Sequence, residues 1–211
     1  MSDLEPSHYS TIVQPSTAEL KIKGSRFIAY ATPVEEQSGG EQILGRLRRT
    51  YHDATHVCYA YRIGIGEQAV YHYSDAGEPA GTAGAPIYQV ISGLELTNLV
   101  VVVVRYFGGT KLGTGGLIRA YSAVTKEVLQ SASVVRREIM AELQFQIGYD
   151  FLNVVLRELS AVGAQILAQN YGEQIHFHIS VAKPRWLRLQ EKLVNQTAGK
   201  IQFFNVDSKT R

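Results

Sequence analysis

The sequence has little cysteine, no long hydrophobic run and almost no excess charge, and each shortage excludes a class of protein. Cys58 is the single cysteine among 211 residues, so no disulfide can form within the chain, which suits a reducing cytosol. The longest apolar run, residues 99–104, is far shorter than the roughly 20 residues of a membrane-spanning helix. The opening MSDLEPSHYS lacks the basic and apolar parts of a signal peptide. We therefore expect a cytoplasmic protein with no membrane association.

The overall charge gives weak support for binding to nucleic acid, because the formal net charge is only +2. The charge is unevenly distributed along the chain. Residues through Val135 carry 11 lysines and arginines against 12 acidic residues, whereas residues from Arg136 onward carry 10 against 7. Hydrophobic residues make up 45% of the chain, which is enough for packed cores.

The first part of the chain, residues 1–135, has the pattern of one mixed domain. After an irregular tail, residues 1–14, alternating or β-branched residues predict four strands, over residues 21–32, 56–63, 69–74 and 99–104. Apolar residues at helical spacing predict three helices, near residues 43–51, 82–92 and 117–128.

The polar stretch of residues 131–138 is the candidate linker to a second domain, residues 136–211. Strands are expected over 139–148, 165–170, 174–181 and 200–206, with one helix after Leu152 and another after Pro184. The resulting order is β-α-β-β-α-β, the ferredoxin-like arrangement. The expected fold class is therefore α+β.

A first glycine-rich segment, residues 74–84 (SDAGEPAGTAG), lies between an expected strand and an expected helix. Glycine permits positive φ and the close approach of a ligand to the backbone. Asp75 and Glu78 could bind a cation, act as acid and base, or accept hydrogen bonds from loop amides. The alternative is a structural turn in which Asp75 caps its own loop and Thr82 caps the helix.

A second glycine-rich segment, residues 105–117 (RYFGGTKLGTGGL), follows the buried strand and opens a helix. Amides at a helix N-terminus, with Arg105 and Lys111 nearby, could bind an anion. Nucleotide motifs do not fit, because a leucine follows Lys111 where a Walker A motif needs serine or threonine, and residues 113–118 fail G-x-G-x-x-G/A at the last position. The alternative is tight packing of a glycine loop on the sheet.

Tyrosines two residues apart share a strand face, so Tyr59 with Tyr61, and Tyr71 with Tyr73, could form a platform that stacks on bases. The alternative is ordinary half-buried tyrosines in a sheet.

Histidines gather in two places, at residues 52–56 together with Asp53, and at residues 176–178. Neither group supplies a third convincing ligand in one local frame. We expect no metal and no cofactor.

Five motifs, in this order along nearly the whole chain, resemble the YigZ/IMPACT family. They are KGSRF at 23–27, ATH at 54–56, the segment 74–84, VVRYFGG at 103–109, and LGTGGL at 112–117. One departure is Ala76, where the family more often has a second aspartate. The resemblance implies an N-terminal domain of the ribosomal-protein-S-five-domain-two-like fold, and a ferredoxin-like C-terminal domain similar to the last domain of elongation factor G.

The resemblance also suggests a role, because eukaryotic relatives regulate translation through protein contacts that interfere with activation of a stress kinase. It transfers no catalytic residue. Our leading hypothesis is a non-enzymatic, translation-linked regulator that binds RNA, the ribosome or a ribosome-associated protein. The candidate binding residues are Arg26, Asp75, Glu78, Thr82, Arg105, Tyr106, Phe107, Lys111, Thr114 and Arg119.

Among these residues, Arg26, Arg105 and Lys111 are expected to contact phosphate or acidic groups, and Tyr106 and Phe107 to stack or anchor. One alternative is an enzyme that acts on a phosphorylated small molecule, with Asp75 or Glu78 as base or magnesium ligand. A second alternative is a protein-docking module. The sequence leaves open whether the two carboxylates face solvent.

Overall fold

The structure, a computed structural model, describes residues 7–204, which divide into two compact units. One unit is Tyr9–Arg137, here called the N-terminal domain, and the other consists mainly of the residues from Glu138 onward, here called the C-terminal domain. Both combine helices with antiparallel sheets, which confirms the α+β class. In the described part of the chain, no helix is long and apolar enough to cross a membrane.

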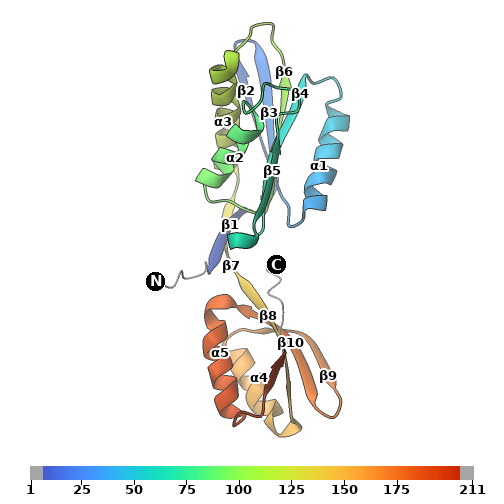
Figure 1. The fold of residues 1–211 in the computed structure, drawn as a ribbon, viewed down its shortest axis with the longest axis vertical. Coiled ribbons are helices and arrows are strands. Elements are labelled where there is room, and N and C mark those ends of the chain that lie inside the picture. Colours follow the sequence, from blue (N-terminus) through green and yellow to red (C-terminus); the bar gives the residue numbers. More distant parts are fainter. Residues whose placement is uncertain (1–6, 205–211) are drawn as a thin grey trace. The chain divides into compact units, whose positions relative to one another are not determined.

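A five-stranded sheet forms the centre of the N-terminal domain (Figure 1). Every neighbouring pair of strands is antiparallel. In sheet order, the strands are β2 (Ser16–Ile22), β3 (Ser25–Pro33), β6 (Leu99–Tyr106), β4 (His56–Ile63) and β5 (Val70–Ser74). The run of valines in β6 is buried on both faces, as its sequence predicted.

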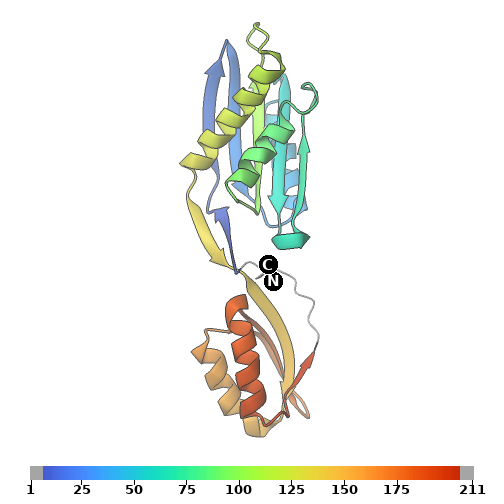
Figure 2. The same ribbon diagram turned by 60° about the vertical axis from the view of Figure 1, so that its left-hand side comes forward.

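Helices cover both faces of this sheet (Figures 1 and 2). On one face α2 (Gly84–Gly93) and α3 (Gly113–Ser131) pack over a core that includes Phe27, Val101 and Tyr121. On the other face α1 (Gln37–Thr50) packs over a smaller cluster that includes Val100 and Val102. Residues adjacent on a strand point to opposite faces, so consecutive residues of β6 contribute to different cores.

Two strands outside the main sheet lie in segments for which the sequence pattern predicts no regular secondary structure. β1 (His8–Ile12) lies in the expected tail and pairs with β7 (Val134–Glu138), which lies in the expected linker. The Val13 amide also donates a hydrogen bond to the Ser133 carbonyl, 2.9 Å away. The segment 131–138 therefore ends in a hydrogen-bonded strand.

The C-terminal domain confirms the order β-α-β-β-α-β. Its elements are β8 (Met140–Ile147), α4 (Leu152–Ala161), β9 (Gln165–Tyr171), β10 (Ile175–Ala182), α5 (Lys183–Gln196) and β11 (Gln202–Phe204). The sheet order is β11-β8-β10-β9, with Phe145 and Phe177 stacked in its core. The last expected strand extends to residue 206, and its final two residues lie outside the described part.

The expected single strand over residues 21–32 is wrong, because the chain reverses within it. Lys23 and Gly24 both have positive φ, 46° and 81°, as a two-residue hairpin turn requires. Ile22 pairs directly with Ser25 across this turn, and the segment becomes the end of β2 and most of β3. Helix α1 also begins earlier than its apolar pattern indicates, at Gln37.

Candidate functional site

The first glycine-rich segment is held together by Asp75. Its carboxylate accepts hydrogen bonds from the amides of Gly81, Ala83 and Gly84, at 2.8, 2.9 and 2.8 Å. Burial raises the pKa of Asp75, but the three amide hydrogen bonds outweigh that effect and leave the pKa below its ordinary value. A Cβ on Gly84 would lie 2.8 Å from the Ser74 backbone. Asp75 therefore fixes the loop and the first turn of α2.

Glu78 lies in the core of the N-terminal domain rather than in solvent, with 2% of its side chain exposed. Arg105, whose side chain is 6% exposed, donates to it at 2.6 Å, and the Tyr121 hydroxyl donates to the same oxygen at 2.8 Å. His56 Nε2 lies 3.8 Å from the other carboxylate oxygen. The acidic group that Arg105 contacts thus belongs to the same chain.

Further polar contacts extend from this pair. Arg105 also donates to the Ser25 hydroxyl, at 3.3 Å, and its guanidinium lies 5.4 Å from the centre of the Phe27 ring. The Cys58 thiol donates to the Asp75 carbonyl at 2.9 Å, and burial raises the pKa of this thiol to about 12. We call this set the buried polar network; its members are Ser25, His56, Cys58, Glu78, Arg105 and Tyr121.

The second glycine-rich segment is anchored at its start to β3. A Cβ on Gly108 would lie 1.8 Å from the Gly24 carbonyl carbon, so the two backbones approach each other as only glycine permits. The Gly108 amide donates to the Ser25 hydroxyl at 3.2 Å, and the Phe107 amide donates to the Thr55 hydroxyl at 2.9 Å. The loop therefore leaves the sheet in a fixed direction.

Beyond this anchor the segment is exposed. Phe107 is 46% exposed, and Lys111, Thr114 and Arg119 are also exposed. We call these four residues, with the glycines between 108 and 116, the loop surface. Among the side chains that the structure describes, no acidic group lies within ion-pair distance of Lys111 or Arg119.

The first turn of α3 lies in the loop surface, without a side-chain cap and without an acidic residue. Gly115 in this turn is open: a Cβ there would meet only the flexible Arg119 guanidinium, at 3.5 Å. Its φ is not in the positive range, so neither space nor backbone conformation requires glycine. That distance places the Arg119 guanidinium close to Gly115 in this turn.

Arg26 and Tyr106 are neighbours on the face of the sheet that α1 covers, opposite the face where Arg105 lies. They are paired across β3 and β6, whereas Phe27 is paired with Arg105 on the α2 and α3 side. Arg26 forms an exposed ion pair with Glu19, at 2.7 Å. The Tyr106 hydroxyl donates to Asp53 at 2.8 Å, and this hydrogen bond raises the pKa of the tyrosine.

The structure thus separates the ten sequence-based candidates into three groups. Arg26 and Tyr106 lie on the α1 face. The second group lies within or beside the buried polar network, where the Thr82 hydroxyl donates to the Pro79 carbonyl at 2.7 Å; its members are Asp75, Glu78, Thr82 and Arg105. The third group forms the loop surface, with members Phe107, Lys111, Thr114 and Arg119.

The two expected tyrosine pairs lie on strands β4 and β5. Tyr61 is buried, and the His72 ring lies 5.8 Å from Tyr59 and 5.9 Å from Tyr61. Tyr71 and Tyr73 are exposed on the other face. Within the described ranges, no three histidine, cysteine or acidic side chains are grouped so that they could hold a metal ion.

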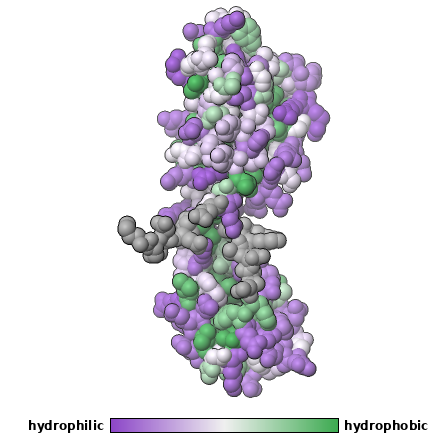
Figure 3. All heavy atoms as spheres, viewed as in Figure 1, coloured by the Kyte–Doolittle hydropathy of each residue, from purple (hydrophilic) through white to green (hydrophobic). Residues whose placement is uncertain are grey.

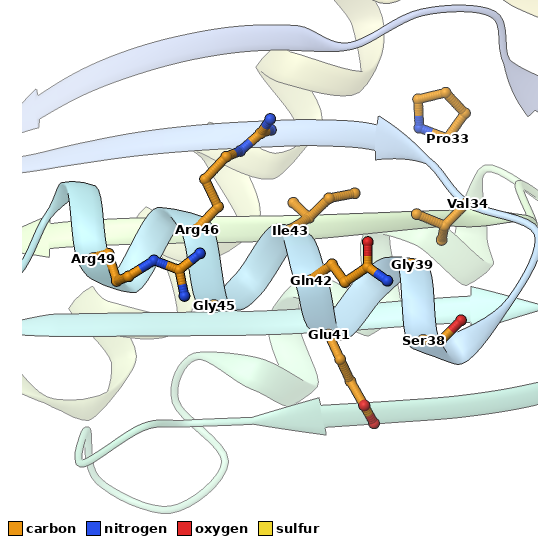
Figure 4. Close-up of a pocket in the computed structure, with 10 residues that line it drawn as sticks. All are labelled: Pro33, Val34, Ser38, Gly39, Glu41, Gln42, Ile43, Gly45, Arg46 and Arg49. Atoms are coloured by element: carbon orange, nitrogen blue, oxygen red, sulfur yellow. The ribbon is translucent and has the colours of Figure 1, made fainter.

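A concave surface on α1 was missed by the sequence interpretation. It has a volume of about 880 Å³ and is lined by the start of α1, the end of β3 and the arginines Arg46 and Arg49. Figure 4 shows Ile43 and Arg46 leaving the helix on one side and Glu41 on the other. This surface contains no aromatic ring, but Ser38 and Gly39 in its lining belong to the first turn of α1, which also lacks a side-chain cap and an acidic residue.

Hydropathy does not mark a large apolar patch on the N-terminal domain in the view of Figure 3, where hydrophobic residues appear scattered among hydrophilic ones. The loop surface differs from the concave surface on α1 in one respect: it adds an exposed aromatic ring, Phe107, to two cations and a helix N-terminus.

Comparisons with known proteins identify relatives of both domains. Residues 23–129 match the family model described as the Impact N-terminal domain, and residues 145–200 match a domain of unknown function, DUF1949. The chain is 33% identical over 192 residues to "IMPACT family member YvyE" of Bacillus subtilis, covering 91% of this chain and 88% of that protein. It is 38% identical over 95 residues to "Protein IMPACT homolog" of Saccharomyces cerevisiae, covering 43% and 36%.

A solved structure agrees with the whole fold. A crystal structure described as that of a hypothetical protein superposes with a TM-score of 0.72 at 27% identity, covering 96% of this chain and 98% of that one.

Proposed function

This chain belongs to the IMPACT family, and from that premise we propose that it is a translation-linked regulator that binds single-stranded RNA through its loop surface. The resemblance to eukaryotic IMPACT proteins supports the link to translation, and ribosomes would place the protein in the cytoplasm. The observation that carries RNA binding is the combination, within the loop surface, of an exposed aromatic ring, Phe107, with two exposed cations, Lys111 and Arg119, at the N-terminus of α3.

The electrostatics of this turn favour an anion. Amides in the first turn of a helix lack intrahelical partners and carry partial positive charge. The first turns of the other described α-helices also lack an acidic residue, so what favours an anion at this one is the addition of two positive charges, Lys111 and Arg119. A phosphate group would accept hydrogen bonds from the amides and neutralise both cations.

Two features favour a nucleotide chain over free phosphate. The exposed ring of Phe107 offers a face for base stacking, which in single-strand binding proteins contributes about 1–3 kcal/mol per base. Gly115 leaves the backbone bare at a position where the fold accepts alanine, so a phosphate oxygen can approach closely. A chain of nucleotides supplies both the base and the phosphate.

Asp75 and Glu78 give little support to the enzymatic alternative. Three backbone amides occupy the Asp75 carboxylate, and Arg105 and Tyr121 occupy that of Glu78. A role as base or magnesium ligand would require breaking contacts that hold the loop.

Fluorescence anisotropy with labelled single-stranded RNA oligonucleotides tests the proposal. Affinity should fall as salt rises, since phosphate contacts release counterions. The double variant Lys111→Ala with Arg119→Ala should bind more weakly and reduce the logarithmic salt slope by about 1.4, which corresponds to two phosphate contacts on a single strand. Phe107→Ala should weaken binding about fivefold or more.

A matched control removes two exposed cations elsewhere, Lys126→Ala with Arg188→Ala, and should leave affinity close to that of the wild type. The proposal fails if RNA does not bind, if both double variants lose affinity equally, or if mononucleotides compete as well as the oligonucleotide. The last result would favour a small phosphorylated substrate. Co-sedimentation with ribosomes then tests the link to translation.

A further inference from the structure

The main sheet of the N-terminal domain ends at β5, whose outer edge has no strand partner within residues 7–204. Four of its five residues are exposed, with Val70 at 53%, Tyr71 at 57% and Tyr73 at 41%. An edge strand presents unpaired amides and carbonyls that can pair with another strand.

This edge lacks the features that protect edge strands in monomeric proteins. β5 reads Val-Tyr-His-Tyr-Ser, with no lysine, glutamate, aspartate or proline, and its pairing with β4 is regular throughout. The opposite edge, β2, carries Glu19 and Lys21. In the C-terminal sheet, the pairing of the edge strand β9 with β10 is irregular between His178 and Ile179 of β10. The other edge strand, β11, has only three residues. Charge, irregularity and shortness are the usual protections.

The sequence of β5 is nearly symmetric about His72. If a second copy pairs with it antiparallel, with the two-fold axis at His72, then Tyr71 of each copy faces Tyr73 of the other. Val70 then faces Ser74. Every residue of the strand finds a partner in this register, and no lysine, arginine or acidic side chain is brought opposite a like charge, because β5 contains none.

We propose that β5 is a dimerisation strand whose occupant is β5 of a second copy of this chain. The rings of Tyr71 and Tyr73 are already held in a row on one face of the sheet. Both stack on Tyr88 of α2, with ring centres 4.5 Å apart for Tyr71 and 6.0 Å apart for Tyr73. Pairing would add cross-strand tyrosine contacts to this row and about four to six main-chain hydrogen bonds. It would join two five-stranded sheets into one.

The small size of the contact sets the strength of the dimer. Stable interfaces bury about 1,200–2,000 Å² in total, with about 20–30 residues on each side, and the five residues of β5 are far fewer. The dimer is therefore weak and dependent on concentration. The proposal does not rest on RNA binding, because no residue of β5 belongs to the loop surface.

Sedimentation equilibrium over about 5–500 μM protein tests the proposal. The wild type should pass from monomer to dimer across this range, whereas Tyr73→Lys, which places a charge in the paired register, should remain monomeric. The matched control is Tyr171→Lys, which changes an exposed tyrosine on the edge strand β9 and should dimerise like the wild type. Circular dichroism establishes that both variants are folded.

Disulfide trapping tests the register. His72→Cys should form a covalent dimer under mild oxidation, because residues opposite each other across an antiparallel pair lie within disulfide reach. Thr17→Cys on the other edge should not, and native Cys58 is buried. A wild type that stays monomeric to the highest concentration, a dimer that survives Tyr73→Lys, or equal trapping at both cysteines would overturn the proposal.

Discussion

Replacing Arg105 with methionine separates a structural role for this arginine from a ligand-binding one. Arg105 and Glu78 are almost fully buried, and their charged atoms lie 2.6 Å apart. Methionine fills similar space but leaves the Glu78 carboxylate with only Tyr121 and His56 as neighbours. Removing one partner of a buried ion pair leaves an uncompensated charge and costs about 3–5 kcal/mol. We expect the free energy of unfolding to fall by that amount.

The assay is urea denaturation followed by far-ultraviolet circular dichroism. Arg26→Met is the matched control, because Arg26 forms an ion pair of nearly equal length, 2.7 Å, with the exposed Glu19. Water and salt screen that pair, so the control should leave the unfolding midpoint close to that of the wild type. If Arg105→Met destabilises the protein no more than Arg26→Met does, the reasoning is refuted, and Arg105 is available for a ligand.

Four further predictions concern the glycine-rich segments and their support. Gly108→Ala should cost about 3 kcal/mol, the upper end of the usual cost of overpacking, since its Cβ would overlap the Gly24 and Ser25 backbone at the β2–β3 turn, whereas Gly115→Ala should stabilise α3 by about 0.5–1 kcal/mol; thermal melting compares the two. Ala76→Asn should raise stability by roughly 0.5–1 kcal/mol in the same assay, because Ala76 has a φ of 45°, which asparagine tolerates better; a loss would contradict this. Asp75→Asn should destabilise the protein at neutral pH but progressively less as pH falls below about 4, because the folded-state pKa is lowered and its stabilisation is lost on protonation; a difference that is constant with pH would refute it. The Cys58 thiol, with its pKa raised to about 12, should react with a thiol reagent at pH 8 only after unfolding, and rapid labelling of the folded protein would show that it is accessible.

The C-terminal domain was predictable because its signals are local. Alternation along β8 and β10, and helical spacing in α4 and α5, are each contained in about ten residues. The same approach failed at residues 21–32, where alternation continues through the turn. The hairpin is shown by the structure, in the positive φ values of Lys23 and Gly24 and in the pairing of Ile22 with Ser25, whereas in the sequence a Lys-Gly pair is a weak turn signal.

The candidate site was predictable in part. The sequence identified both glycine-rich segments, but it could not show that Glu78 and Arg105, 27 residues apart, are partners in the core. One signal was present: Arg105 continues the alternation of Val101 and Val103, which face the α2 and α3 core. A charged residue on a buried face needs a partner, and the other segment offered two carboxylates, Asp75 and Glu78. The binding role of Lys111 and Arg119 stays a prediction.

The central claim is that the candidate residues of the two glycine-rich segments divide into a buried polar network, which stabilises the fold, and a loop surface, which binds RNA. Measuring stability and RNA affinity together in two variants tests this division. Arg105→Met should lower the free energy of unfolding by about 3–5 kcal/mol while the folded protein keeps its affinity for RNA. The double variant Lys111→Ala with Arg119→Ala should melt like the wild type and lose affinity. The reverse pattern, with affinity lost in Arg105→Met and kept in the double variant, would contradict the account.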